Sequence, residues 1–173
     1  VEGVLGRVEA LLPPPEPDPD WTAVTAARWR KRGGRGYLHA VAHPHAIDAD
    51  ELVAIDAQKA AIDRNTHQFV RGLPANNVLL TGSRGTGKSS LVKAMLATYA
   101  KAGLRLIEVD KSDLVDLPDI VERVEARRER FVVFCDDLTF DAGEPGYKAL
   151  KVALDGSIAG PSGNVLIYAT SNR

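Results

Sequence analysis

The apolar residues of this chain form two kinds of pattern, which alternate from residue 77 onwards. Four short stretches are almost entirely apolar, and between them apolar residues recur every three or four positions over longer stretches. An uninterrupted apolar run indicates a strand buried on both faces, and the wider spacing indicates an amphipathic helix. The predicted strands are residues 77–81, 104–110, 131–137 and 164–172, and the predicted helices are residues 88–102, 117–130 and 145–160. This alternation predicts an α/β fold, in which a parallel sheet is covered by helices on both faces.

The first part of the chain is less regular. Residues 1–12 have helical spacing, and the prolines of residues 13–20 end this helix, because proline lacks an amide donor. We therefore expect residues 1–20 to be a helix and a proline-rich linker, and residues 21–46 to be a region without an assigned structure. Residues 47–173 form the predicted core domain, which begins with a helix over 50–71 that has Asp48 or Asp50 as its N-cap.

Composition narrows the class of protein. The chain has 173 residues, a formal net charge of −1, 45% hydrophobic and 26% charged residues, which is typical of one globular domain. A net charge so near zero argues against a protein that coats polyanions. No apolar run approaches the roughly 18 residues of a membrane-spanning helix, and the sequence contains no charged-then-apolar pattern typical of a signal peptide. The single cysteine, Cys135, excludes an internal disulfide and favours a cytoplasmic location. Because the chain begins with Val1 rather than methionine, we expect it to be a piece of a longer protein.

Three glycines stand where a predicted helix should begin. Residues 82–89 read GSRGTGKS and match the phosphate-binding pattern G-x-x-x-x-G-K-[ST] at every position, between a strand and a helix. Bare backbone lets amide groups approach a polyphosphate, and the following helix adds its positive end. Lys88 then reaches the outer phosphates, and the Ser89 hydroxyl binds Mg²⁺. The predicted nucleotide-binding residues are Gly82, Ser83, Arg84, Gly85, Thr86, Gly87, Lys88, Ser89 and Ser90, with ATP and Mg²⁺ as cofactors. The residues do not distinguish adenine from guanine, although the N-K-x-D motif of GTPases is absent.

Polar residues follow two of the predicted strands. The run FVVFCDD puts Asp136 and Asp137 at the carboxyl end of a strand, the edge at which open α/β sheets bind ligands. The run NVLIYATSN brings Thr170, Ser171 and Asn172 to the same edge. Asp136 is expected to hold Mg²⁺, Asp137 to act as a general base, and Asn172 to orient the attacking water. The predicted catalytic residues are Lys88, Asp137 and Asn172, and the predicted Mg²⁺ ligands are Ser89 and Asp136.

Together, GSRGTGKS, FCDD and YATSN resemble the AAA+ branch of the P-loop NTPases. Over residues 47–173 the chain resembles a bacterial AAA+ family first catalogued as a domain of unknown function. The resemblance implies Walker A at 82–89, Walker B at Asp136 and Asp137, and sensor 1 at Asn172. It also implies a three-layer α/β/α fold in which the Asn172 strand lies between the glycine-loop strand and the Asp136 strand.

The resemblance has further implications outside these motifs. The stretch from Leu52 to Ile55 is expected to pack near the adenine, and a fifth strand, a helical lid, the sensor-2 arginine and an arginine finger are expected beyond Arg173. Asp137 departs from the glutamate that most AAA+ proteins have here. Its carboxylate reaches less far, which argues against fast hydrolysis.

These residues predict an ATP-binding AAA+ module in which Mg²⁺-dependent hydrolysis remodels or regulates an unknown client protein, with the intact protein a homo-oligomer. The piece ending at Arg173 is expected to bind nucleotide with little turnover, since an arginine finger contributes several orders of magnitude in rate. One alternative is a nucleotide or small-molecule kinase, in which the Walker B strand lies directly beside the phosphate-loop strand. Another is a switch that binds ATP without hydrolysing it.

Two weaker signals lie in the N-terminal region. Five basic residues with two aromatic ones can contact nucleic acid, although charged clusters of this size are usually solvated surface. They are Arg28, Arg30, Lys31, Arg32 and Arg35, with Trp29 and Tyr37. His39, His43 and His45 have a loose metal-like spacing but lack a partner cysteine. Cys135, in the middle of a predicted strand, is interpreted as a small core residue.

Overall fold

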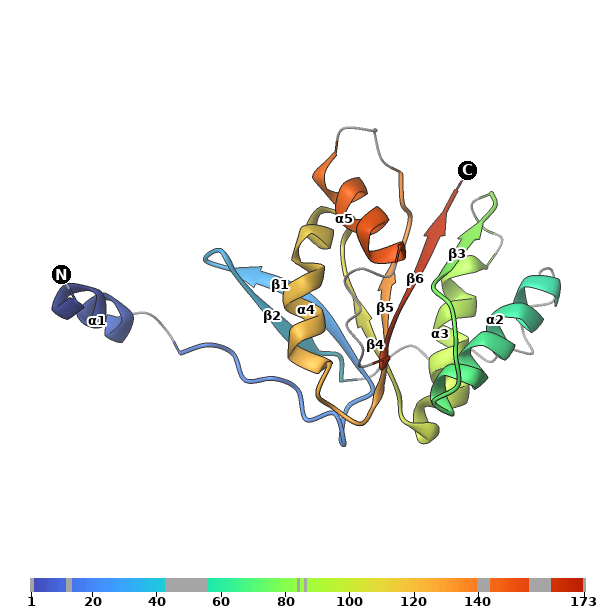
Figure 1. Ribbon diagram of the computed structural model, residues 1–173, viewed down its shortest axis with the longest axis horizontal. Coiled ribbons are helices and arrows are strands. Elements are labelled where there is room, and N and C mark those ends of the chain that lie inside the picture. Colours follow the sequence, from blue (N-terminus) through green and yellow to red (C-terminus); the bar gives the residue numbers. More distant parts are fainter. Residues whose placement is uncertain are drawn as a thin grey trace.

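The sheet at the centre of the molecule is built from strands far apart in the sequence (Figure 1). The computed structural model describes residues 2–11, 14–42, 56–83, 85, 87–139, 144–155 and 163–172. The strands in these residues are β1 (Ala26–Arg32), β2 (Arg35–Ala40), β3 (Val78–Thr81), β4 (Leu104–Glu108), β5 (Arg130–Cys135) and β6 (Val165–Ser171). They form a six-stranded sheet in the order β2-β1-β4-β5-β6-β3.

All the pairings in this sheet are parallel except that of β1 with β2, which form an antiparallel hairpin. The four predicted strands are present, and the parallel sheet is confirmed. β6 lies between β3 and β5, which is the order that the resemblance to AAA+ proteins implied. The carboxyl ends of β3, β5 and β6 therefore meet at one edge of the sheet.

The inner strands of the sheet contribute to two cores, one on each face. Alternate side chains of β5 point to opposite faces, so that Phe131, Val133 and Cys135 join one buried cluster while Val132 and Phe134 join the other. β6 divides in the same way. This is why both strands read as continuous apolar runs rather than as alternating ones.

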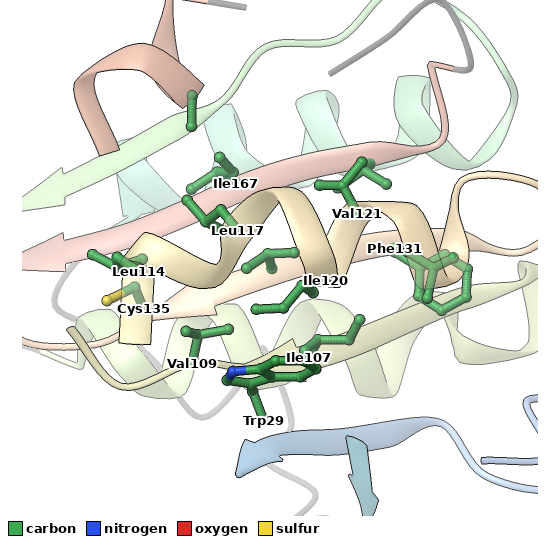
Figure 2. Packing of buried hydrophobic residues seen from close by; sticks show 14 of the residues in the cluster. Trp29, Ile107, Val109, Leu114, Leu117, Ile120, Val121, Phe131, Cys135 and Ile167 are labelled. Carbon is green, nitrogen blue, oxygen red and sulfur yellow. The ribbon is translucent and has the colours of Figure 1, made fainter. Parts of the chain in front are cut away.

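Helices cover both faces of the sheet. The helical elements are α1 (Glu2–Leu11), α2 (Asp56–Val70), α3 (Lys88–Tyr99), the 3₁₀ helices η3 (Ala100–Ala102) and η4 (Lys111–Asp116), α4 (Leu117–Val124) and α5 (Pro145–Leu154). α2 and α3 contribute to one core, and η4, α4 and α5 to the other. Figure 2 shows the second core, in which Leu114, Leu117 and Ile120 lie above Ile107 and Cys135 of the sheet. None of the helices in the described residues is both long and apolar enough to cross a membrane.

The predicted helix over 117–130 is shorter in the structure and ends at Val124. The reason is a long-range contact. The side-chain amide of Asn164 donates to the carbonyl oxygens of Val124, Arg127 and Glu129, at 2.9, 3.1 and 3.4 Å. These carbonyl groups are satisfied without a further helical turn, and the chain enters β5 at Arg130. Of the predicted helix over 145–160, residues 145–154 are helical, and residues 156–160 lie outside the described residues.

The region 21–46, which the sequence pattern left unassigned, contains the β1–β2 hairpin. Its turn consists of Gly33 and Gly34, both with positive φ, as a two-residue hairpin turn requires. β1 pairs with β4, and Trp21, Trp29 and Leu38 are buried in the same core as α4. β1 and β2 are thus part of the same sheet as the strands of the predicted core domain. By contrast, α1 exposes its apolar side chains, Val4, Leu5, Val8 and Leu11.

Candidate functional site

The glycine loop, residues 82–89, connects β3 to α3 at the carboxyl edge of the sheet. Gly87 directly precedes the helix and has a φ of 86°, in the left-handed region that a side chain would strain. Its carbonyl group accepts the first helical hydrogen bond, from the Leu91 N–H at 2.9 Å. The amide groups of the first turn of α3 are therefore presented at this edge. Arg84 and Thr86, two of the predicted nucleotide-binding residues, lie outside the described residues.

Lys88, the first residue of α3, turns its side chain back into the loop. Its Nζ donates to the carbonyl oxygens of Gly82 and Ser83, each at 2.7 Å, and the residue is only 5% exposed. These contacts hold a positive charge within the glycine loop. An ammonium group in this position, with helix amides beside it, favours an anionic ligand.

Ser89 and Asp136 are joined by a hydrogen bond across the site. The Ser89 Oγ donates to Asp136 Oδ1 at 2.5 Å, linking the start of α3 to the end of β5. Hydroxyl and carboxylate oxygens are the ligands that hard divalent cations prefer, and Mg²⁺ is usually held by few protein groups because it keeps several waters. This pair of side chains therefore fits Mg²⁺.

Asp137 has an unusual backbone conformation and is held from β6. Its φ is 58°, a value that aspartate tolerates better than most residues. The Asn172 Nδ2 donates to Asp137 Oδ1 at 2.5 Å. The Asp137 N–H donates to the hydroxyl of Thr170 at 2.8 Å, and the same hydroxyl donates to Asp136 Oδ1. The sequence pattern predicted that Thr170 lies at this edge but assigned it no role.

These groups surround a single cavity of about 370 Å³. The residues that line it are Gly85, Gly87, Lys88, Ser89, Ser90, Asp136, Asp137, Thr170 and Asn172. Of the described residues predicted to bind nucleotide, Gly82 and Ser83 do not line this cavity, but their carbonyl groups hold Lys88. The cavity thus has cationic and amide donors at one side and a cluster of oxygen ligands at the other, which suits a phosphate chain with a divalent cation.

Two larger cavities have different chemistry. One, of about 790 Å³, lies beside β3 and has a largely apolar lining that includes Phe69, Leu73 and Leu79. The other, of about 830 Å³, is a polar groove between the β1–β2 hairpin and the two aspartates, Asp136 and Asp137. Because the smallest of the three holds the glycine loop, donor chemistry rather than volume identifies the candidate site.

The polar groove contains several of the basic residues considered for nucleic acid. Its five cationic residues, Arg28, Arg30, Lys31, Lys93 and Lys111, face five carboxylates. Arg28 pairs with Glu108 at 3.2 Å, and Lys31 pairs with Asp116 at 2.9 Å. The hydrogen bond from Lys31 to Asp116 raises the pKa of Lys31, and burial raises the pKa of Asp113. This balance of charge gives the groove little attraction for a phosphate backbone.

The remaining predictions concern metal and thiol chemistry. His39 is exposed on β2, and His43, His45 and the stretch 52–55 lie outside the described residues. In the part of the chain that the structure describes, no three or more His, Cys, Asp or Glu side chains are grouped to hold a metal ion. Cys135 is buried, and burial raises its pKa to about 12, so the interpretation as a core residue is confirmed.

Comparison with known proteins identifies the family of this chain. A family model described as "Protein of unknown function (DUF815)" matches residues 22–173. No curated protein sequence matches the chain. Among solved structures, the crystal structure of DnaI has a TM-score of 0.51 and 16% sequence identity, and the match covers 88% of this chain and 78% of that one.

Two further structures match over a smaller part of their length. They are the RuvB Holliday junction branch migration motor of Thermotoga maritima, with a TM-score of 0.48 and 19% identity, and AMPPCP-bound DnaA from Aquifex aeolicus, with a TM-score of 0.48 and 17% identity. Each match covers 73% of this chain, which spans 41% of the RuvB chain and 42% of the DnaA chain. The strand order and the likeness to DnaI identify the fold as that of the AAA+ P-loop NTPases.

Proposed function

This chain belongs to the DUF815 family, and we propose that it is an AAA+ module that binds ATP and hydrolyses it with Mg²⁺. In the whole protein, hydrolysis drives remodelling or regulation of a client protein by a homo-oligomer in the cytoplasm. The observation that carries the proposal is the convergence of the glycine loop, Ser89, Asp136, Asp137 and Asn172 on one cavity at the carboxyl edge of the sheet.

The glycine loop, as Walker A, binds the phosphate chain. Its backbone amides and the first turn of α3 donate to phosphate oxygens, and Lys88 neutralises part of their charge. The carbonyl groups of Gly82 and Ser83 hold the Lys88 ammonium against the backbone of the loop. These hydrogen bonds restrict the conformations of the lysine side chain, which lowers the entropy cost of a phosphate contact.

Asp136, as the Walker B aspartate, and Ser89 hold Mg²⁺ with their oxygens. Bound Mg²⁺ supplies positive charge that stabilises the negative charge gathering on the phosphate oxygens during transfer. Asp136 belongs to a strand end and Ser89 to a helix, so the hydrogen bond between them fixes the distance between the two ligands. The preformed pair of oxygen ligands is consistent with a site for a small cation that has a strict coordination geometry, as Mg²⁺ has.

Asp137 acts as the general base, and Asn172 acts as sensor 1. The amide of Asn172 donates to Asp137 Oδ1 and so orients the carboxylate. A carboxylate oxygen of Asp137 takes the proton of the attacking water, whose oxygen forms the new bond to the terminal phosphorus while the bond to ADP breaks. The products are ADP and inorganic phosphate.

The order of the strands bears on the kinase alternative. In such kinases the Walker B strand lies directly beside the phosphate-loop strand, whereas here β6 separates β5 from β3. This order argues against the kinase alternative. The non-hydrolysing switch remains a second candidate, because Asp137 is one methylene shorter than the glutamate of most AAA+ proteins.

The two candidates are separated by measuring binding and turnover on the full-length parent protein. We expect titration calorimetry to detect Mg²⁺–ATP binding, and a phosphate-release assay to detect hydrolysis. The variant Asp137→Asn should keep its affinity within about twofold and lose turnover by at least about 100-fold, because an amide cannot accept the proton. Binding without turnover in the wild type would support the switch. An absence of binding heat would overturn both.

A further inference from the structure

Thr170 lies at the point where the ends of β5 and β6 are joined. It pairs in register with Leu80 of β3 and is only 1% exposed, so its hydroxyl group is buried. A buried hydroxyl group is costly unless it forms hydrogen bonds, and its partners therefore indicate what it does. Its two hydrogen-bond partners belong to the two residues that follow β5, Asp136 and Asp137.

The direction of these two hydrogen bonds is fixed by chemistry. The backbone N–H of Asp137 can only donate, so Thr170 Oγ1 accepts from it at 2.8 Å. The one hydroxyl proton is then directed to Asp136 Oδ1, 2.5 Å away. The Thr170 carbonyl oxygen also accepts from the N–H of Leu138 at 2.8 Å. One residue of β6 thus holds three consecutive residues after β5.

These contacts enclose the strained residue of the site. Asp137 has a φ of 58°, and such conformations persist only where the surrounding structure imposes them. Thr170 contacts the N–H of Asp137 on one side and the N–H of Leu138 on the other. The resulting conformation brings the Asp137 carboxylate to Asn172, whose amide donates to it.

We propose that Thr170 is a positioning residue for the phosphate-transfer site, and that it sets the backbone of Asp137 and the orientation of Asp136 through its single hydroxyl group. The proposal rests on the proposed function for its effect on hydrolysis, but the hydrogen bonds themselves are testable without nucleotide. Thr170 acts through the two aspartates and is not assigned a contact with the nucleotide.

The hydroxyl group is not equally important for the two aspartates. Asp136 Oδ1 also accepts from Ser89, so it keeps a donor when the Thr170 hydroxyl is removed. The Asp137 N–H donates to the Thr170 hydroxyl group at 2.8 Å, and this hydrogen bond is lost when the hydroxyl group is removed. Removing the hydroxyl should therefore impair catalysis more than binding of Mg²⁺–ATP.

The first test compares Thr170→Val, which keeps the shape of the side chain, with Thr170→Ser, which keeps the hydroxyl. In the full-length protein we expect Thr170→Val to lower kcat at least about tenfold while KM and the calorimetric Kd for Mg²⁺–ATP stay within about threefold. Thr170→Ser should remain within about threefold of the wild type. The matched control is Thr98→Val at an exposed residue of α3, which removes a hydroxyl group that donates to the carbonyl oxygen of Ala94. It should leave all three quantities unchanged.

The second test measures hydrogen exchange of the Asp137 amide by NMR, without nucleotide. In the wild type this amide should be protected at least about tenfold relative to an unstructured amide, and Thr170→Val should remove the protection while Thr170→Ser retains it. The Ile167 amide, in the middle of β6, serves as the internal control. An unprotected Asp137 amide in the wild type overturns the proposal even if Thr170→Val does not fold.

The two tests separate the failure of this proposal from the failure of the proposed function. If the wild type binds or hydrolyses no ATP, the proposed function is wrong. The exchange measurement still tests whether Thr170 holds the Asp137 amide. Unchanged exchange and unchanged kcat in a folded Thr170→Val variant overturn the positioning role while the ATPase proposal stands.

Discussion

The side chain of Asn172 donates from Nδ2 to Oδ1 of Asp137 at 2.5 Å, joining the residue after β6 to the second residue after β5. The two residues are separated by 35 positions in the chain. Their contact depends on β5 and β6 being neighbours in parallel register, with Cys135 paired to Ala169. The amide thus orients the proposed general base from an adjacent strand.

Removing this amide should slow hydrolysis without weakening binding. In Asn172→Ala, the Asp137 carboxylate loses the donor that orients it, and we expect kcat to fall by roughly 10- to 100-fold with KM within about threefold. Phosphate release by the full-length protein provides the measurement. A fall in kcat/KM caused by KM alone would contradict the role of Asn172 as an orienting group.

Replacing the lysine of the glycine loop should abolish tight nucleotide binding. Lys88→Ala removes the buried ammonium that contacts the carbonyl groups of Gly82 and Ser83, and we expect the Kd for Mg²⁺–ATP to rise at least about tenfold. The control is Lys93→Ala, on the same helix but lining the polar groove instead. Calorimetry should show wild-type affinity for Lys93→Ala, and equal losses in both variants would argue against a specific phosphate contact.

Gly36 of the β1–β2 hairpin packs so closely against Trp29 that it leaves no room for a Cβ atom. A Cβ atom at Gly36 would lie 1.8 Å from Cζ2 of Trp29, whose ring is buried in the core and stacked under Arg123. Gly36→Ala should therefore destabilise the protein by about 1–3 kcal/mol, which lowers Tm by roughly 3–10 °C. Gly3→Ala, where a Cβ meets nothing within 4 Å, is the matched control and should leave Tm unchanged. Equal Tm values for Gly36→Ala and the wild type would contradict the close packing of Gly36 against Trp29.

The buried thiol of Cys135 makes stability depend on pH in the alkaline range. Burial raises the pKa of Cys135 to about 12 in the folded protein, whereas the unfolded value is about 8.5. The contribution is fully present below the unfolded pKa and is lost as pH rises towards the folded pKa, because the unfolded thiol ionises first. Urea unfolding from pH 8 to 11 should show a steeper loss of stability for the wild type than for Cys135→Ala. If the free energies of unfolding of the two proteins fell in parallel with pH, the raised pKa of Cys135 would be contradicted.

Several features of the site were predictable because they depend on neighbours in the sequence. The glycine loop matches a complete local pattern between a strand and a helix, and Asp136 follows an uninterrupted apolar strand. The burial of Cys135 follows from its place in that strand. The β1–β2 hairpin was not assigned, because β1 has buried and exposed positions without strict alternation and ends in three exposed residues. Its Gly33–Gly34 turn was the local signal that indicated a hairpin.

The sequence by itself determined the class of fold and the glycine loop between β3 and α3, because apolar spacing and glycine placement act over a few residues and carry their own conformational preferences. Only the tertiary structure decided that Thr170 holds Asp136 and Asp137, that Asn164 ends α4 at Val124, and that β1 and β2 extend the sheet. The contacts of Thr170, of Asn164 and of β1 with β4 join residues more than 30 positions apart, so they depend on how distant elements pack rather than on any local pattern.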